Sequence, residues 1–182
     1  MISELMERDH RQLSALLNEL LVALDEQSPA ATFALLDLFW ARLAVHIRAE
    51  NLCLFPALVR AFPGVDNATL PPFDEVNAAI ETLRSDHNFF MAQLSTAVNI
   101  MRDAQSRPEG PQNVVNACED VRGIVAAVSE RLSQHDRLEE EKVYKWTDTI
   151  LSAAEAGLLV RALKRELDNM PPRFTSANSS TL

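Results

Sequence analysis

The chain of 182 residues is the size of a single domain, and its 47% hydrophobic content is enough to bury a sizeable core. A formal net charge of −9 argues against a nucleic-acid partner, and two cysteines without CxxC spacing argue against a secreted disulfide framework. The N-terminus has no signal-peptide pattern, and no apolar stretch approaches the roughly 20 residues of a membrane span, so we expect a cytoplasmic protein without a membrane partner.

Apolar residues recur at helical spacing along most of the chain, and the alternation typical of strands is absent, so we predict an all-α fold. The pattern predicts helices over about residues 2–26, 33–61, 76–101 and 113–146. Between these helices lie the segments QSPA, FPGVDNATLPPF and QSRPEGPQN, which are rich in residues that break helices. Four long helices with short connections predict an up-down-up-down four-helix bundle.

A fifth helix is predicted after the bundle, because Ser152 and Glu155 have the spacing of a capping box. Its apolar residues and the prolines that end it are Leu158, Leu159, Leu163, Leu167, Pro171 and Pro172. The apolar stripe must be covered, either by docking on the bundle or by a second copy in a homodimer. We therefore expect a bundle over residues 1–150, a fifth helix over 151–170 and a flexible tail over 171–182.

Four histidines fall one to each helix of the predicted bundle, within its apolar stripe: His10, His46, His87 and His135. In an antiparallel bundle, residues on neighbouring helices share a height if they are equally far from the turn between them. The midpoints of consecutive histidines fall at Ser28, between residues 66 and 67, and at Pro111, all within the helix-breaking segments. Because a helix rises about 1.5 Å per residue, the four imidazoles should meet in one layer of the core.

Two glutamates join this layer, because Glu50 follows His46 and Glu139 follows His135 by four residues, on the same helical face. A single core histidine is usually hydrogen-bonded to backbone, and a single His-x3-Glu pair is common on solvated faces. Neither explanation accounts for six such groups at one height, because buried polar groups without partners each cost a few kcal/mol. A pair of cations would supply those partners, and the two carboxylates could bridge them.

The donor set indicates which metals would suit this layer. Imidazole and carboxylate without thiolate suit Fe, Mn or Zn. Six protein ligands for two metals leave coordination positions open, and iron is favoured because such positions would bind O₂, peroxide, NO or azide. The Glu-x-x-His pairs of ferritin-like bundles have the opposite order and a different spacing, so that family is disfavoured.

The ordered ligand set and the residues around it resemble the bacterial hemerythrin-like HHE cation-binding domains. The matching segments are DHRQL at 9–13, HIRAENLCLFP at 46–56, DHNFF at 86–90 and HDRLEEEKVY at 135–144, and the resemblance covers about residues 1–150. It implies a hemerythrin bundle with a non-haem centre of two iron ions per chain. By the same resemblance Glu50 and Glu139 bridge the irons, together with an oxo or hydroxo group, and the four histidines complete the ligand set.

The chain differs from the oxygen-carrying hemerythrins in two ways. They have a second histidine four residues after the one on the third helix, where this chain has Met91, and they end with His-x4-Asp, where this chain has His-x3-Glu. The ligand set is more similar to the stress-linked branch, which includes di-iron proteins that repair iron–sulfur clusters. Repair proteins of that branch usually carry an additional N-terminal domain with a Cys pair, whereas this sequence begins directly with the first helix.

Other polar and aromatic residues near the ligands have less specific interpretations. We expect Cys53 to be a packed core cysteine, and Glu140 and Glu141 to form a solvated acidic face. On an ideal helix Tyr144 lies about half a turn out of phase with His135, so we do not assign it to the site, whereas Trp146 shares the ligand face and should pack in the core. Three phenylalanines could either line the site or pack in the core: Phe55, Phe89 and Phe90.

Three functions fit these observations. The first is a di-iron protein that binds or reduces a small gaseous or peroxide ligand in sensing, storage or stress detoxification, with or without turnover as an enzyme. The second is an iron donor or repair factor for damaged iron–sulfur clusters. The third is a helical interaction or regulatory module without active metal chemistry. Each could act as a monomer or as a homodimer.

Overall fold

A computed structural model describes residues 1–62, 70–106 and 111–175 of the chain. These residues form an all-α structure in which no strand occurs. The helices of the bundle are α1 (Ile2–Asp25), α2 (Pro29–Ala49), α3 (Phe55–Ala61), α4 (Phe73–Ser106), α5 (Pro111–Leu138) and α6 (Tyr144–Ile150). Two π-helical turns join them, η1 (Glu50–Leu54) and η3 (Glu139–Val143), and α7 (Ala153–Leu167) and α8 (Pro172–Thr175) follow.

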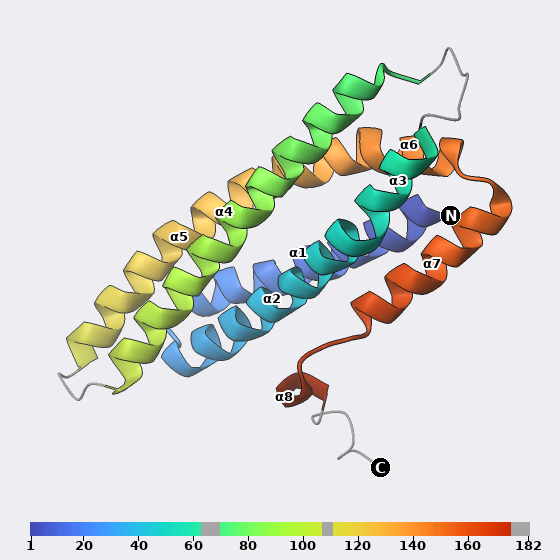
Figure 1. Ribbon diagram of the computed structural model, residues 1–182. Coiled ribbons are helices and arrows are strands. Elements are labelled where there is room, and N and C mark those ends of the chain that lie inside the picture. The colour runs from blue at the N-terminus through green and yellow to red at the C-terminus, as the bar shows by residue number, and fades with distance from the viewer. Residues whose placement is uncertain (63–69, 107–110, 176–182) are drawn as a thin grey trace.

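The helices form the predicted up-down-up-down bundle (Figure 1). The chain runs down α1, back along α2, η1 and α3, down α4 and back along α5, η3 and α6. The largest interfaces join α1 to α2, α4 to α5 and α2 to α4. The N-terminus of α1 is held by α6, because Asp148 accepts hydrogen bonds from the backbone N–H groups of Ile2 and Ser3 at 2.9 and 3.1 Å. Most of the two long connecting segments lies outside the described residues.

Each π-helical turn begins at one of the two candidate bridging glutamates. The backbone N–H of Phe55 bonds to the carbonyl of Glu50, and that of Tyr144 bonds to the carbonyl of Glu139, five residues back in each case. Pro56, which has no N–H, favours the break in regular bonding at the first turn. The extra residue rotates everything beyond it by about 100° relative to an ideal α-helix.

This rotation corrects two sequence-based expectations. The apolar stripe of the second helix does not continue through Cys53 and Ala57 but through three fully buried residues, Leu54, Phe55 and Leu58. Trp146 does not share the ligand face either: it is half-buried, with the Lys142 ammonium 5.9 Å from its ring centroid. Tyr144 and Thr147, both fully buried, take the inward positions instead.

Two apolar clusters fill the bundle, one on each side of the histidine layer. The larger cluster lies toward the α1–α2 turn and includes Leu20, Phe39, Phe90 and Val125. The smaller cluster lies at the opposite end. On each of the four long helices the histidine lies where one cluster gives way to the other, so apolar packing encloses the polar layer from both ends.

Helix α7 packs against α2 and η1 and buries Leu159, Leu163 and Leu167 in the smaller cluster. Its predicted capping box is confirmed: Glu155 N–H donates to Ser152 Oγ at 3.4 Å, and Ser152 N–H donates to Glu155 Oε2 at 2.9 Å. Three of the four leucines of the predicted stripe are thus covered within one chain, whereas Leu158 is 62% exposed. Of the segment expected to be a flexible tail, residues 172–175 form α8, and residues 176–182 lie outside the described residues.

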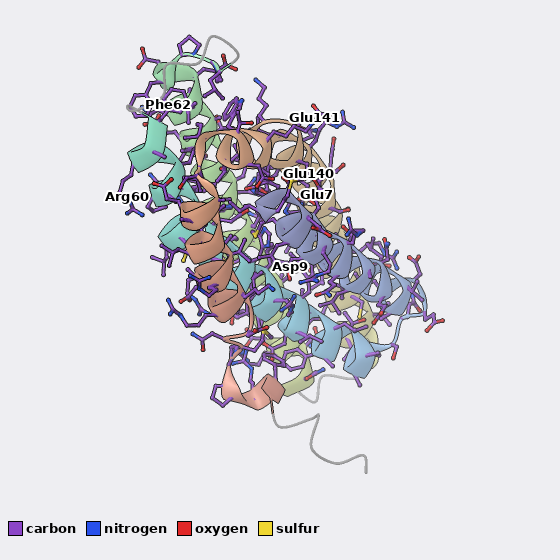
Figure 2. The ribbon with its side chains drawn as sticks, turned by 90° about the vertical axis from the view of Figure 1, so that its right-hand side faces the viewer. Glu7, Asp9, Arg60, Phe62, Glu140 and Glu141 are labelled. Carbon is purple, nitrogen blue, oxygen red and sulfur yellow. The ribbon has the colours of Figure 1, made fainter. Side chains whose placement is uncertain are left out.

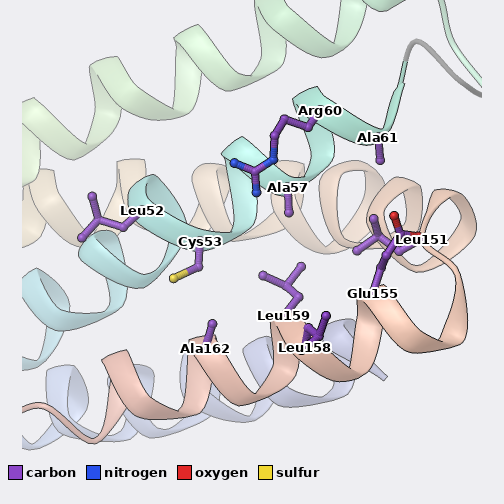
Figure 3. Close-up of a pocket in the computed structure, with 10 residues that line it drawn as sticks. All are labelled: Leu52, Cys53, Ala57, Arg60, Ala61, Leu151, Glu155, Leu158, Leu159 and Ala162. Carbon is purple, nitrogen blue, oxygen red and sulfur yellow. The ribbon is translucent and has the colours of Figure 1, made fainter.

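Between α7 and the η1–α3 segment lies a groove of about 380 Å³ (Figure 3). Half-buried Cys53 lines it, together with the exposed side chains of Leu52 and Leu158. Burial raises the pKa of the Cys53 thiol above its usual value, which disfavours the reactive thiolate. Cys53 belongs to neither of the two metal-binding groups found among the described residues.

The continuous helix Pro29–Ala61 corrects the expectation that no stretch approaches the length of a membrane span. It has 33 residues and a mean hydropathy of 1.4 over its most apolar window, so length and composition alone would allow it to cross a membrane. Core helices pass the same test. This one carries His46 and Glu50, both buried inside the bundle.

Candidate metal centre

Six buried side chains from the four long helical segments meet in the layer between the two apolar clusters: His10, His46, Glu50, His87, His135 and Glu139. Each residue is at most 3% exposed, and both glutamates are fully buried. The ring centroids of His10 and His46 lie 4.8 Å apart, and those of His87 and His135 lie 4.9 Å apart. The structure thus brings together all six residues that the sequence suggested as ligands.

The six side chains form two overlapping groups, each able to hold a cation. Position 1 comprises His10, His46, Glu50 and Glu139, and position 2 comprises His87, His135, Glu50 and Glu139. Glu50 places Oε1 3.3 Å from His46 Nε2 and Oε2 3.3 Å from His87 Nε2. Glu139 does the same for the other histidine of each position, at 3.3 and 3.4 Å. Each carboxylate therefore spans both positions, as a bridging ligand would.

The buried polar atoms of this layer fit a pair of cations. Among the described residues, three of its atoms are buried without a hydrogen-bond partner: Glu50 Oε2, His87 Nε2 and Glu139 Oε1. Each belongs to position 2. A buried donor or acceptor without a partner costs about 1–3 kcal/mol, and a bound cation would remove that cost. Imidazole and carboxylate donors suit iron, manganese or zinc.

Without a cation, the imidazoles and carboxylates balance charge among themselves. Burial lowers the pKa of His135, but the Glu139 carboxylate outweighs this effect and raises the pKa to about 9. In the same way burial opposes the charge of Glu50 at His46, whose pKa is raised well above its usual value. Burial raises the pKa of Glu50, but the charge of His46 holds it well below its usual value. A bound cation would take the place of these imidazole protons.

A second layer of side chains orients the histidines of position 1. Asp9 is 6% exposed, and its Oδ2 accepts a hydrogen bond from His46 Nδ1 at 2.9 Å. Its Oδ1 accepts another from Arg42 at 2.6 Å. Burial raises the pKa of Asp9, but His46 and Arg42 outweigh it and lower the pKa below its usual value. The Asp9 contact keeps the proton of His46 on Nδ1 and turns Nε2 toward the metal position.

Position 2 repeats this arrangement. Asp86 Oδ2 lies 3.2 Å from His135 Nδ1, and Asp86 Oδ1 accepts from Arg131 Nε at 2.6 Å. The two halves share a sequence pattern, in which an Asp-His pair on one helix is followed by Arg-x3-His-x3-Glu on the next. In the first half the pattern covers residues 9–10 and 42–50, and in the second half it covers residues 86–87 and 131–139. Sequence reasoning missed the two aspartates and two arginines, although this repeat could have revealed them.

A family model for the hemerythrin HHE cation binding domain matches residues 1–147. The chain belongs to this family. No curated protein and no solved structure matched the chain at a significant level. With its two histidine–glutamate groups, the chain is a metal-binding hemerythrin-like protein, able to bind iron or another cation.

Tyr144 is the main residue of the hemerythrin-like centre that sequence reasoning excluded. That exclusion was wrong because it assumed an ideal helix, whereas the π-helical turn η3 rotates Tyr144 into the layer. Its hydroxyl lies 2.7 Å from Glu50 Oε1, 3.0 Å from Glu139 Oε2 and 3.0 Å from His10 Nε2, all atoms of position 1. Burial and the two carboxylates raise the pKa of Tyr144 well above its usual value, so the hydroxyl keeps its proton.

Glu140 is partly solvated, with a side chain 40% exposed, but it also contacts the centre. Its Oε1 accepts a hydrogen bond from His10 Nδ1 at 2.8 Å, so it orients His10 much as Asp9 orients His46. Figure 2 labels Glu140, Glu141 and Asp9. Glu141 is exposed, as expected. In the other half of the hemerythrin-like centre, the side-chain amide of Asn51 lies 3.2 Å from His87 Nδ1.

Two of the three phenylalanines line the metal layer. Phe55 stacks on His87 with ring centroids 5.9 Å apart, and Phe90 meets His135 edge-on at 5.3 Å. Phe89 points away from the centre, where the Arg131 guanidinium lies 4.5 Å from its ring centroid. Position 2 is therefore walled by aromatic rings, whereas position 1 faces a hydroxyl.

Proposed function

We propose that the protein is a non-haem di-iron protein that binds or reduces a small ligand, such as O₂, NO or peroxide, in sensing, storage or stress detoxification. The observation that carries this proposal is the pair of glutamates, each of which presents one oxygen to each position. In that arrangement Glu50 and Glu139 would bridge two irons, and two histidines would complete each protein ligand set. Two nitrogens and two oxygens per iron leave room for an exogenous ligand.

The surrounding residues suit small-ligand chemistry. The iron pair, when bound, would supply open coordination positions and reducing electrons. Phe55 and Phe90 exclude water from one side of the layer. Tyr144 holds a proton within hydrogen-bond reach of position 1 and can donate it to a bound ligand. A buried hydroxyl group that remains protonated at neutral pH is suited to hydrogen-bond a ligand that carries negative charge.

The test is metal analysis followed by ligand titration. After aerobic reconstitution we expect two irons per chain, a charge-transfer band in the near-ultraviolet and visible, and a changed spectrum with NO, azide or peroxide. Glu50→Ala removes one bridge and should reduce the iron content and abolish the band. Glu81→Ala, on the exposed face of α4, is the matched control. Uptake of less than one iron by the unaltered protein, without the band, would refute the proposal.

A second candidate is an iron donor or repair factor for damaged iron–sulfur clusters. A polar surface cleft that reaches His10 favours it, because iron that must be delivered needs a way out. This role predicts iron that a chelator removes quickly, and restored activity of a damaged cluster enzyme. Iron retained against a strong chelator would eliminate the donor role and leave the small-ligand role standing.

A further inference from the structure

The two halves of the centre share one pattern, but three of the matched positions at which they differ bear directly on the metal layer. Superposing the Arg-x3-His-x3-Glu segments pairs Asp136 with Ile47, Glu140 with Asn51, and Tyr144 with Phe55. In each pair, the more polar or acidic residue belongs to the second segment. All three of these residues lie beside His10, at 3.9 Å, 2.8 Å and 3.0 Å from its ring nitrogens. The polar environment is therefore concentrated on position 1.

A cleft of about 460 Å³ between α1 and α5 leads from the surface to the same histidine. Its lining includes His10, Ser14, Ser133, Asp136 and Glu140. The Asp136 side chain is 20% exposed, and its Oδ1 lies 3.9 Å from His10 Nε2, the nitrogen that faces position 1. One carboxylate thus faces both the open cleft and the metal position. Two arginines also line the cleft, and both are solvent-exposed.

The hollow beside position 2 has a different geometry. A hollow between α4 and α5 reaches His135, but from the Nδ1 side, where Asp86 and Arg131 are engaged with each other. The metal-facing nitrogen of His135 points inward, next to Phe90. Ile47, which is 8% exposed, takes the place of Asp136 in this half. Asp86, the carboxylate of this hollow that contacts His135, therefore faces Nδ1 and not the metal-facing nitrogen, unlike Asp136 at position 1.

This inference rests on the proposed di-iron function. We propose that the α1–α5 cleft is the route by which Fe²⁺ enters and leaves position 1, and that the Asp136 carboxylate holds the cation in transit. Oxygen donors and water are suitable transient ligands for a hydrated divalent cation, whereas exchange at position 2 requires the layer to open. Position 1 is then the exchangeable site, and position 2 the retained one.

The test measures the kinetics of iron release and uptake under anaerobic conditions. The reconstituted protein is mixed with a ferrous chelator in a stopped-flow instrument, and we expect a fast and a slow phase of equal amplitude. Asp136→Asn should slow the fast phase roughly tenfold, within the range by which charged clefts accelerate association. It should leave the slow phase and the equilibrium affinity unchanged. Asp136→Glu, which keeps the carboxylate, should retain the fast phase.

Single-position proteins assign the phases. His87→Ala keeps position 1 and should retain the dependence on Asp136, whereas His10→Ala keeps position 2 and should lose it. Glu130→Gln, in the hollow between α4 and α5, is the matched control for a general effect of surface charge. The proposed route would be overturned if Glu130→Gln slowed the fast phase as much as Asp136→Asn does. It would also be overturned if Asp136→Asn slowed both phases equally or changed neither phase.

Equilibrium affinity separates a route from a permanent ligand. If Asp136→Asn weakens iron binding at equilibrium, Asp136 is a ligand of position 1, and its proposed role in transit is overturned. A protein that takes up no iron would refute the proposed function and this inference together. A protein with two irons whose exchange does not depend on Asp136 would refute the inference alone.

Discussion

Asp9→Asn is the sharpest test of whether the bundle orients the histidines of position 1 for metal binding. The substitution keeps the size of the side chain but removes its charge and one of its two acceptor oxygens. Asp9 uses both oxygens, one for His46 Nδ1 and one for Arg42. The asparagine can satisfy only one of these donors, so either the His46 ring loses the contact that orients it or Arg42 loses its carboxylate partner.

The expected magnitude follows from the role of Asp9 behind the ligand. Loss of an outer hydrogen bond to a metal-bound histidine typically weakens metal binding about 10–100-fold, or about 1.4–2.7 kcal/mol. Asp9 is 6% exposed, but it lines a cavity of about 300 Å³ beside Arg42, where water can reach the Arg42 guanidinium. We therefore expect a loss within that range, confined to position 1.

The assay is a competitive titration of Fe²⁺ against a chelator of known affinity, in anaerobic solution. Asp9→Asn should weaken one of the two binding steps and leave the other unchanged. Asp86→Asn should give the mirror result, which can be assigned in the His87→Ala and His10→Ala backgrounds. Asp37→Asn, in an exposed pair with Arg173, is the control and should change neither step. Unfolding experiments should show the same loss as a smaller stabilisation by metal.

Two results would refute this reasoning. Equal weakening of both steps would mean that Asp9 supports the bundle as a whole rather than one position. An unchanged affinity, with stability lowered equally in the presence and absence of metal, would mean that the Asp9–Arg42 pair serves folding alone.

Three further predictions address the hydroxyl, the protons and the fifth helix. Tyr144→Phe removes one hydrogen bond worth about 1 kcal/mol, so azide or NO should bind the reconstituted protein about fivefold more weakly in spectral titration, with iron content unchanged. Because the metal-free pKa of His135 is about 9, metal binding near neutral pH must release the proton of His135. Iron affinity should therefore fall as the pH falls, and calorimetry in buffers of different ionisation enthalpy should detect the released proton. Leu163→Ala should lower the free energy of unfolding by about 2–5 kcal/mol, because Leu163 is fully buried, whereas Leu158→Ala, at a side chain 62% exposed, should change it by less than about 0.5 kcal/mol in the same denaturant titration.

The fold and the common height of the histidines could be predicted from sequence because both depend on few quantities. The bundle follows from long apolar stripes separated by helix breakers, and the height follows from the helical rise and the positions of three turns. His10 and His46 come before either π-helical turn, on their own helices, so ideal geometry places them correctly. His87 lies within the uninterrupted helix α4, and His135 precedes η3.

Residues beyond Glu50 and Glu139 could not be placed in the same way. The π-helical turns begin at Glu50 and Glu139, so every residue after them is rotated relative to an ideal helix. Pro56 is a local signal for the first turn, but no proline marks the second. The ideal-helix argument therefore pointed to Trp146 and away from Tyr144, the residue whose hydroxyl lies in the layer.

The π-helical turns also account for the difference between the two halves. An aromatic residue lies five after Glu50 and another lies five after Glu139, and the extra residue of each π-helical turn points both aromatics inward. The same kind of π-helical turn therefore places the hydroxyl of Tyr144 at position 1 and the apolar ring of Phe55 at position 2. Exchanging them, with Tyr144→Phe and Phe55→Tyr together, should move the hydrogen bond to position 2 without changing the bundle. If the asymmetry arises at these side chains, the ligand-bound spectrum of the double variant should be closer to that of the unaltered protein than the spectrum of the Tyr144→Phe variant is. If the double variant instead has the same spectrum as Tyr144→Phe, the asymmetry originates in the cleft.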